Sequence, residues 1–449
     1  MLFTRLRIGN ADRMSQFLFQ PVSGQQRQLA LMRYMKTATD LISSELRLWG
    51  LKLVDTVVIS NGVLLQADQL LHLGNGDVVP VESRGWLNRL SDLVVHTPVR
   101  ITDWVVIAQR GDENTVTSMV ENLINDAPNL GIEISEPITC RYLQRDEAKA
   151  YVGALRSIQA EKPELQLAVV IMRASRDDIY REVKKWAFNL QSGSIATQIL
   201  IRDTARAIAH RLDVSLSVIT QINCKMGGDL WTLDGALTDT LVIGMSGYTG
   251  VSGEPWVGVV ASKDRLFSKW YSTAFKDMSQ FRFYMAKAMR KYKLENRGEV
   301  AHTTVVFRRQ LPPVSHEETT ALQEACGLNT AIVVVNLLDG VELAEYFDAE
   351  ITNNGIEGLK NLHKKLIFVP YRKGVPTDSL VFYVEKNIAN LEVEKITKVI
   401  KQLKHMYFNV AGEVPLPAPL LYAGKCVEFI ADILEEPPEE KFEDTLYYL

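Results

Sequence analysis

The chain has 449 residues, of which 47% are hydrophobic and 23% are charged, and its 50 basic and 54 acidic side chains leave a formal net charge of -4. These proportions are typical of a globular protein with several hydrophobic cores, and they exclude a disordered chain or a disulfide scaffold. The four cysteines have neither CxxC nor CxH spacing, so we expect no zinc site and a reducing compartment. No segment approaches the roughly 18 apolar residues of a membrane-spanning helix. We therefore predict a soluble intracellular protein, without distinguishing cytoplasm from nucleus.

The N-terminal part is predicted to contain one helix and a small β-rich connector. Apolar residues recur at helical spacing over residues 26–48. Short apolar runs follow, and they are broken by Asn61-Gly62 and by Gly74-Asn75-Gly76, which are typical of tight turns.

From Ile101 onward, strands alternate with helices. A buried-type strand at 104–107 precedes an amphipathic helix at 116–124, and a second pair follows at 165–172 and 179–190. Because parallel strands need helical crossovers, this alternation predicts an α/β layer with a parallel sheet.

A second series begins near Thr238, and it has a different order. Three strands come first, then a helix, a strand, a helix and a strand, at 241–243, 256–260, 269–273, 279–292, 303–307, 317–324 and 332–336. This order occurs in ribonuclease H-like folds, although order alone does not establish a fold. A late amphipathic helix is predicted over 393–403.

Charge is distributed unevenly along this second series. Residues 263–309 contain 12 basic and 4 acidic side chains, a local charge of +8, whereas the tail after Leu434 is acidic. Such a basic stretch is either a solvated helix face or a surface that binds phosphate groups.

Several segments carry more specific motifs. The most distinctive are QINCKMGGDLW at 221–231 and the terminal LYYL at 446–449. Weaker matches occur in the expected order, namely ELRLWGLKL at 45–53, DWVVIAQRGDEN at 103–114, CRYLQRDEAKAYVGAL at 140–155, KWYSTAF at 269–275 and PLPAPLLYAGK at 415–425. Together these segments resemble the Argonaute superfamily, and within it the Piwi clade.

The resemblance implies an α/β protein with three parts. Residues 1–97 would form a linker region, residues 98–235 a Rossmann-like MID domain, and residues 236–449 a PIWI domain of ribonuclease H-like fold. The family's N-terminal and PAZ domains are not expected in this sequence, which would leave the 3′ end of a guide without its usual anchor.

In this family the MID domain binds the 5′-phosphate of a small guide RNA. The resemblance places Tyr180 on the first base and Lys184 on the phosphate, and their spacing of four puts both on one helix face. Gln198, Gln221 and Lys225 would complete the pocket, although Ala196-Thr197 replaces the usual Pro-Ser before Gln198.

The Piwi clade has Gln at the position of Gln221, where other members have a second lysine. The family compensates with a divalent cation, here expected to be Mg²⁺ held through the guide phosphate by Gln221 and the C-terminal carboxylate of Leu449. Each of these residues, taken alone, is also compatible with a surface or capping role.

Active members of the family cut target RNA with a carboxylate-rich tetrad that holds two metal ions. The resemblance places other residues at the tetrad positions, namely Ser246, Phe281, Arg309 and Gly424. Because hard divalent cations need oxygen ligands, we predict no slicing activity and no catalytic metal. Arg309 is expected either to pair with a nearby carboxylate or to contact the RNA backbone together with Arg282, Arg290, Lys291 and Arg308.

The favoured interpretation is a catalytically inactive Piwi-type Argonaute that acts in gene silencing. It would bind a small guide RNA such as a piRNA, recognise a target RNA and recruit silencing effector proteins. Two alternatives remain open. One is an Argonaute-derived interaction scaffold without RNA binding, and the other is one half of a two-subunit Argonaute that works with a PAZ-containing or nuclease subunit.

Overall fold

The computed structural model describes residues 24–50, 70–80, 93–188, 195–233, 239–326, 331–338, 348–352, 355–360, 365–368, 371–372, 375–376 and 380–449. The chain divides into two compact units, Met1–Gln66 with Ile367–Leu380 and Ala67–Leu366 with Val381–Leu449. In the first unit, helix α2 (Gly24–Leu48) confirms the predicted N-terminal helix. The turn predicted at Asn61-Gly62 lies outside the described residues. No helix in the described ranges is long and apolar enough to cross a membrane.

The second unit begins with a three-stranded sheet, in the order β2-β1-β9. Its strands are β1 (Leu70–His72), β2 (Val78–Pro80) and β9 (Thr232–Leu233). The predicted turn at 74–76 joins β1 to β2, and Gly76 has φ +84°, a left-handed conformation that favours glycine.

The predicted α/β layer is a four-stranded parallel sheet with the order β6-β4-β7-β8. The strands are β4 (Trp104–Gln109), β6 (Thr139–Leu143), β7 (Leu167–Met172) and β8 (Ala196–Ile201). Every residue of β4 and β7 is buried, as expected where helices cover both faces of a sheet. The short strands β3 (Arg100–Ile101) and β5 (Glu133–Ile134) pair beside this sheet.

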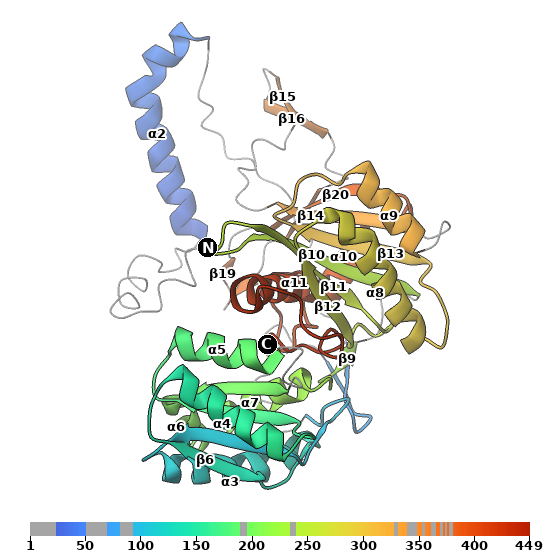
Figure 1. Ribbon diagram of the computed structural model, residues 1–449. Coiled ribbons are helices and arrows are strands. Elements are labelled where there is room, and N and C mark those ends of the chain that lie inside the picture. The colour runs from blue at the N-terminus through green and yellow to red at the C-terminus, as the bar shows by residue number, and fades with distance from the viewer. Residues whose placement is uncertain are drawn as a thin grey trace. The chain divides into compact units, whose positions relative to one another are not determined.

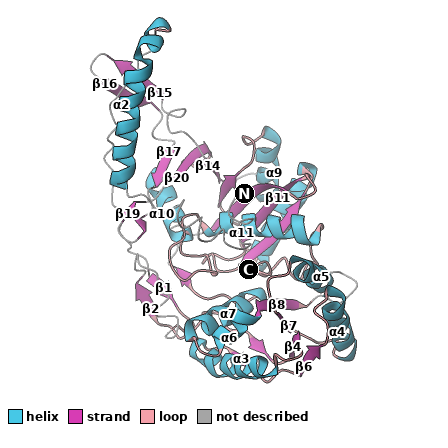
Figure 2. Cartoon of the chain, turned by 90° about the vertical axis from the view of Figure 1, so that its left-hand side faces the viewer, coloured by secondary structure: helices cyan, strands magenta, loops and turns pink. Residues whose placement is uncertain are grey.

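Helices cover both faces of this sheet (Figures 1 and 2). The helices α4 (Ala148–Glu161) and α5 (Asp177–Phe188) pack together on one face. The other face carries α3 (Glu113–Asp126), α6 (Arg202–Ile208) and α7 (Leu212–Lys225). This arrangement brings α5, β8 and α7 next to one another, and the residues of the site come from these elements.

A second sheet contains the strand order β12-β11-β10-β13-β14-β20. Its strands are β10 (Thr240–Thr249), β11 (Pro255–Ser262), β12 (Trp270–Phe275), β13 (Thr303–Arg309), β14 (Ala331–Leu338) and β20 (Leu380–Asn387). The first three strands form an antiparallel meander, and β10, β13 and β14 run parallel. The sequence of elements agrees with the predicted ribonuclease H-like order.

Helices lie on both faces of the second sheet. The helices α8 (Phe281–Glu295) and α9 (His316–Cys326) cover one hydrophobic core, and α11 (Ala418–Phe429) packs on β10, β11 and β12. Glycines allow α11 to approach closely, because a Cβ at Gly244 would lie 2.2 Å from the carbonyl oxygen of Pro419. Helix α10 (Val393–Leu403) is the predicted late amphipathic helix, and a short π-helix (Ile430–Leu434) extends α11.

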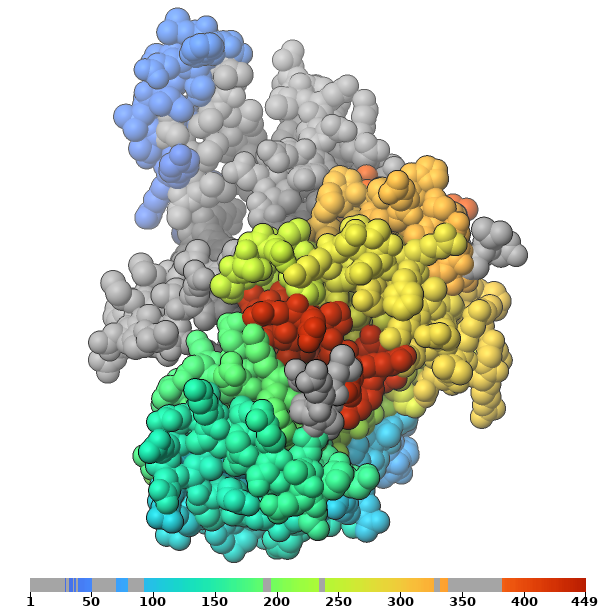
Figure 3. Space-filling view, in the orientation of Figure 1, coloured from blue at the N-terminus to red at the C-terminus, as the bar shows by residue number. Residues whose placement is uncertain are grey.

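The C-terminal segment connects the two sheet regions. In Figure 3 it forms the red surface between the green residues of the first region and the yellow residues of the second. The amide of Leu446 donates to the carbonyl of Cys224 at 3.3 Å, and the rings of Phe442 and Tyr447 pack against Phe188 of α5. The chain end is thereby fixed beside α5 and α7.

Candidate functional site

Five of the residues predicted to bind the guide belong to elements of the first sheet region, and the structure brings these five together. Lys184, on α5, donates to the hydroxyl and carbonyl oxygens of Thr197 at 2.8 and 3.2 Å. Lys225, at the end of α7, donates to Gln198 Oε1 at 2.7 Å. Gln198 in turn donates to Gln221 Oε1 at 3.2 Å. One hydrogen-bonded group therefore links α5, β8 and α7.

Tyr180 lies at the edge of this group. Its ring centroid is 5.7 Å from the ammonium of Lys184, within the range of a cation–π contact. Tyr180 is half-buried, and burial raises the pKa of its phenol to about 12. The phenol is therefore uncharged at neutral pH, and its ring can stack on an aromatic ligand.

Sequence reasoning missed a third lysine of this cluster. Lys425 comes from α11, some 200 positions further along the chain, and its charge lowers the pKa of Lys225. Burial is the larger cause, and together they bring the pKa of Lys225 to about 7. The pKa values of Lys184 and Lys425 are also lowered, in both cases mainly by burial, and Lys225 adds to the effect on Lys184. We call Lys184, Lys225 and Lys425 the lysine cluster.

The surroundings of the lysine cluster leave its charge poorly balanced. Asn409, also missed by sequence reasoning, accepts a hydrogen bond from Gln221 Nε2 at 3.1 Å. The carboxylate whose charge acts on Lys425 is Glu428, one turn further along α11. Since a buried ammonium group is costly without counter-charge, an anion bound beside these lysines would stabilise their charged form.

Leu449 is half-buried at the end of this region, and its amide donates to the carbonyl of Leu446 at 3.1 Å. Its predicted role beside Gln221 in holding a cation stays a prediction. Among the described residues, no group of three or more His, Cys, Asp or Glu side chains is placed to hold a metal ion.

Three of the four predicted tetrad positions also lie together. Ser246 on β10 is the register partner of Arg309 on β13. A Cβ at Gly424 of α11 would lie 3.9 Å from Ser246 Oγ. Arg309 also lowers the pKa of Glu428, although burial and Asp432 raise that pKa overall. This electrostatic effect on Glu428 supports the first of the two expectations for Arg309, that it pairs with a nearby carboxylate.

Phe281 has a different environment from the other three. It starts α8, is 2% exposed, and belongs to the hydrophobic core between α8 and the sheet. Its ring centroid lies 6.5 Å from that of Phe275 on β12. The residue stabilises the position of α8 through packing.

Two of the predicted RNA-backbone contacts need correction. Arg308 is 2% exposed, and its guanidinium lies 3.1 Å from Glu318 and 3.6 Å from Glu385, so the prediction that it contacts RNA is wrong. Lys291 donates to Asp444 of the acidic tail at 2.7 Å, which removes it as a free cation. Arg282 is exposed but lies 3.1 Å from Glu324, and Arg290 is exposed on α8.

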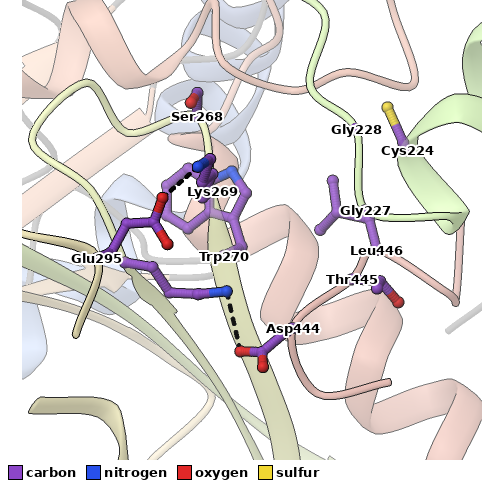
Figure 4. Close-up of a pocket in the computed structure, with 11 residues that line it drawn as sticks. Cys224, Gly227, Gly228, Ser268, Lys269, Trp270, Glu295, Asp444, Thr445 and Leu446 are labelled. Carbon is purple, nitrogen blue, oxygen red and sulfur yellow. Dashed lines mark hydrogen bonds and ion pairs between the residues drawn. The ribbon is translucent and has the colours of Figure 1, made fainter. Parts of the chain in front are cut away.

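A separate cavity of about 270 Å³ lies between the end of α7, the start of β12 and the C-terminal segment (Figure 4). Two ion pairs cross it, Lys269 with Glu295 and Lys263 with Asp444, the latter at 3.0 Å. Ser268 on its wall contacts both Asp229 and Asp264, at 2.9 and 3.0 Å. Because its cations are already paired, this cavity is a weaker anion site than the lysine cluster.

Comparison with known proteins shows what this chain is similar to. Residues 167–334 match the family model described as the Piwi domain. The protein named "Protein argonaute-3" of Drosophila melanogaster is 24% identical over 460 residues, covering 96% of this chain and 52% of that protein. Residues 167–334 are thus similar to a Piwi domain, and the chain as a whole is similar to Argonaute and Piwi proteins.

Further comparisons agree with this assignment. "Piwi-like protein 1" of Gallus gallus is 23% identical to this Piwi relative over 94% of the chain and 51% of that protein. The crystal structure of Drosophila Piwi superposes with a TM-score of 0.81 at 19% identity, covering 98% of this chain and 63% of that one. The C-terminal lobe of a budding yeast Argonaute gives 0.68 at 11% identity, covering 85% and 93%. The chain spans about half the length of the curated relatives it matches.

Proposed function

We propose that this protein binds the 5′-phosphorylated end of a small guide RNA and acts in RNA-guided silencing by recognising target RNA and recruiting effector proteins. The observation that carries the proposal is the lysine cluster, in which the buried Lys184 and Lys225 bond to β8 and the half-buried Lys425 comes from the second sheet region. A terminal phosphate carries close to two negative charges at pH 7 and offers three acceptor oxygens. Such a group would neutralise the cluster, while Tyr180 would stack on the first base.

The proposed domain boundaries follow from the same assignment. We place the MID domain at 98–235 and the PIWI domain at 236–449, so that Lys184 and Lys225 belong to the first and Lys425 to the second. The phosphate would then bind where the two domains meet.

We further propose that the protein does not slice its target. Ser246, Arg309 and Gly424 do not fit a site for two divalent cations, because none of them offers a carboxylate and Arg309 is a cation. Their mutual proximity supports the alignment with the tetrad.

A divalent cation fits the guide-phosphate site better than the nuclease site. Gln221 offers one oxygen ligand, and Mg²⁺ commonly completes its shell with phosphate oxygens and water. When bound, such a cation would supply positive charge to the phosphate. The hydrogen bonds of Lys225 to Gln198 and of Lys184 to Thr197 would still hold these side chains in position to orient the phosphate.

The decisive experiment is equilibrium binding of a 5′-phosphorylated single-stranded RNA and its 5′-hydroxyl twin, with Mg²⁺ and with EDTA. The wild type should prefer the phosphorylated strand, and Lys225→Met should reduce the preference by about tenfold or more, since hydrogen bonds to charged groups contribute about 1.5–3 kcal/mol. Lys149→Met, at an exposed position of α4, is the matched control and should leave the preference unchanged.

Equal binding of both strands by the wild type would contradict guide binding. It would favour the alternative of an interaction scaffold without RNA binding, which one observation supports. Lys263, Lys287 and Lys291 of the basic region are paired with the acidic tail rather than exposed to RNA. A twofold or larger loss in EDTA would support the cation at Gln221. A strand of DNA belongs in the same series, because the Argonaute of Clostridium butyricum was solved with a guide DNA.

A further inference from the structure

Helix α8 presents three chemically different faces. One face is buried in the core, and its side chains are Phe281, Met285, Ala288, Met289 and Tyr292. A second face holds Lys287 and Lys291, which lie 2.5 Å from Glu443 and 2.7 Å from Asp444 of the C-terminal tail. At 100° per residue, Phe283, Arg290 and Leu294 fall on the side opposite the core, and Arg282, Ala286 and Lys293 lie next to them.

We call this third side the outward face of α8, and it consists of Arg282, Phe283, Ala286, Arg290, Lys293 and Leu294. Its own side chains include three cations and no carboxylate, and one of the cations, Arg282, lies 3.1 Å from Glu324 of α9. Two large apolar side chains are strongly exposed, Phe283 at 63% and Leu294 at 75%. Figures 1 and 3 show α8 on the near side of the second sheet region, where it contributes to the yellow surface.

We propose that the outward face of α8 binds an acidic peptide segment of a partner protein that carries two large apolar side chains. Phe283 and Leu294 are eleven residues apart, which corresponds to about 16 Å along a helix with a rise of 1.5 Å per residue. The partner's apolar residues would cover these two side chains, and its carboxylates would pair with Arg290 and Lys293 between them. Apolar contacts combined with charged and polar contacts are the usual composition of such interfaces.

The same helix already binds a segment of this chemistry. The C-terminal tail places Glu440, Glu443 and Asp444 against the second face of α8, while its Phe442 enters an aromatic cluster with Phe188 and Tyr447. The tail shows that acidic side chains next to an aromatic residue can be accommodated along this helix. The outward face offers similar cations and has exposed apolar surface in addition.

A protein partner explains the outward face better than RNA does. Phosphate groups would use Arg290 and Lys293, but an aliphatic side chain such as Leu294 can neither stack on a base nor bond to it. Leu294 is 75% exposed, and an apolar side chain of a protein partner would remove it from water. The proposal is independent of guide binding.

The test is selection from a displayed library of random 16-residue peptides on the purified full chain, followed by affinity measurement of the enriched peptides. The outward-face variant is Arg290→Glu with Leu294→Ser. The matched control is Arg156→Glu with Val251→Ser, which changes an exposed arginine of α4 and an apolar loop residue that is 70% exposed. Thermal unfolding of both variants shows whether they fold as the wild type does.

We expect enriched peptides that combine acidic residues with two large apolar residues. They should bind the outward-face variant at least tenfold more weakly and the control with unchanged affinity. Equal binding to all three proteins, enrichment of peptides without acidic residues, or no enrichment above a blank surface would overturn the proposal. A tenfold loss of 5′-hydroxyl RNA binding in the outward-face variant would instead assign this face to RNA.

Discussion

Lys225 is central to the proposed guide binding, and both its burial and a neighbouring charge change its pKa. Burial and then Lys425 lower its pKa from 10.5 to about 7. Between these two values the unfolded chain binds more protons at this lysine than the folded protein does. The lysine therefore destabilises the free protein below about pH 7, and this cost is relieved as the pH rises from 7 toward 10.5.

This shift predicts the pH dependence of guide binding. Phosphate should raise the pKa of Lys225, so binding takes up a proton wherever free Lys225 is neutral. The affinity for 5′-phosphorylated RNA should therefore fall above about pH 7, and it should also fall below about pH 6, where the phosphate loses its second charge. Titrations between pH 5.5 and 9 would show this maximum, and Lys225→Met should abolish the alkaline limb. A flat profile for the wild type would contradict the proposed role of Lys225.

Gly228 lies between helix α7 and strand β9, and its lack of a side chain matters. A Cβ here would lie 2.4 Å from Asn223 Nδ2 and 2.5 Å from the carbonyl oxygen of Thr97. Asn223 itself accepts a hydrogen bond from the amide of Val99 at 2.9 Å. The glycine therefore permits a close packing of three chain segments.

We predict that Gly228→Ala lowers the free energy of unfolding by about 1–3 kcal/mol, the usual cost of overpacking. Chemical denaturation would measure the change. Gly153→Ala is the control, because nothing lies within 4 Å of the added Cβ and this residue is inside α4. It should stabilise the protein by up to about 1 kcal/mol, since alanine is the better helix former. Equal effects of both substitutions would argue against the packing at Gly228.

At the scale of elements, the acidic tail pairs with two lysines of the basic helix α8, Lys287 and Lys291. The ammonium of Lys287 lies 2.5 Å from a carboxylate oxygen of Glu443, and both side chains are at least 90% buried. Burial raises the pKa of Glu443, and Lys287 opposes this rise by favouring the charged carboxylate. The tail thus pairs with several of the basic side chains that the sequence offered as contacts for RNA phosphates.

Breaking this pair should destabilise the protein strongly. Lys287→Met leaves Glu443 buried without a partner, and the expected loss is about 3–5 kcal/mol. Adding Glu443→Gln should recover a large part of the loss, because the second change removes the unpaired charge. Lys441→Met, whose lysine is exposed and lies 3.7 Å from Glu439, is the control and should cost under about 1 kcal/mol. Additive losses in the double variant would show that the two charges are not coupled.

At the scale of the whole molecule, both proposed properties depend on α11. This helix lies against β10 and β11 through Gly244 and Gly258, where added Cβ atoms would meet its backbone at 2.2 and 2.5 Å. It supplies Lys425 to the lysine cluster and places Gly424 beside Ser246. One helix therefore completes the proposed guide site and contributes to the altered tetrad.

We predict no cleavage of a matched target RNA by the guide-loaded protein in either Mg²⁺ or Mn²⁺. The reason is that Arg309 and Gly424 cannot bind a metal ion and Ser246 offers only a hydroxyl. Gel analysis of a labelled target would detect cleavage, and digestion of the same duplex by a ribonuclease serves as the positive control. Metal-dependent cleavage at a single internal position would overturn the prediction, provided that Lys225→Met abolishes it.

The sequence by itself determined the types of elements, their order and the resemblance to Argonaute and Piwi proteins. Periodicity reveals helices and strands locally, and the motif at 221–231 already contained Gln221 and Lys225. The predicted partners Lys184 and Gln198 also proved to lie in the same hydrogen-bonded group. Local pattern was sufficient here because each of these residues sits at a defined position of a regular element.

Only the tertiary structure decided which charges are free. Arg308 and Arg309 are adjacent in sequence, but successive residues of a strand point to opposite faces, so Arg308 meets Glu318 of α9 whereas Arg309 acts on Glu428 of α11. Likewise, Lys425 joins Lys225 across 200 residues, and the acidic tail returns to neutralise Lys287 and Lys291. Electrostatic energies depend on distance and burial in space, and neither follows from the separation of residues along the chain.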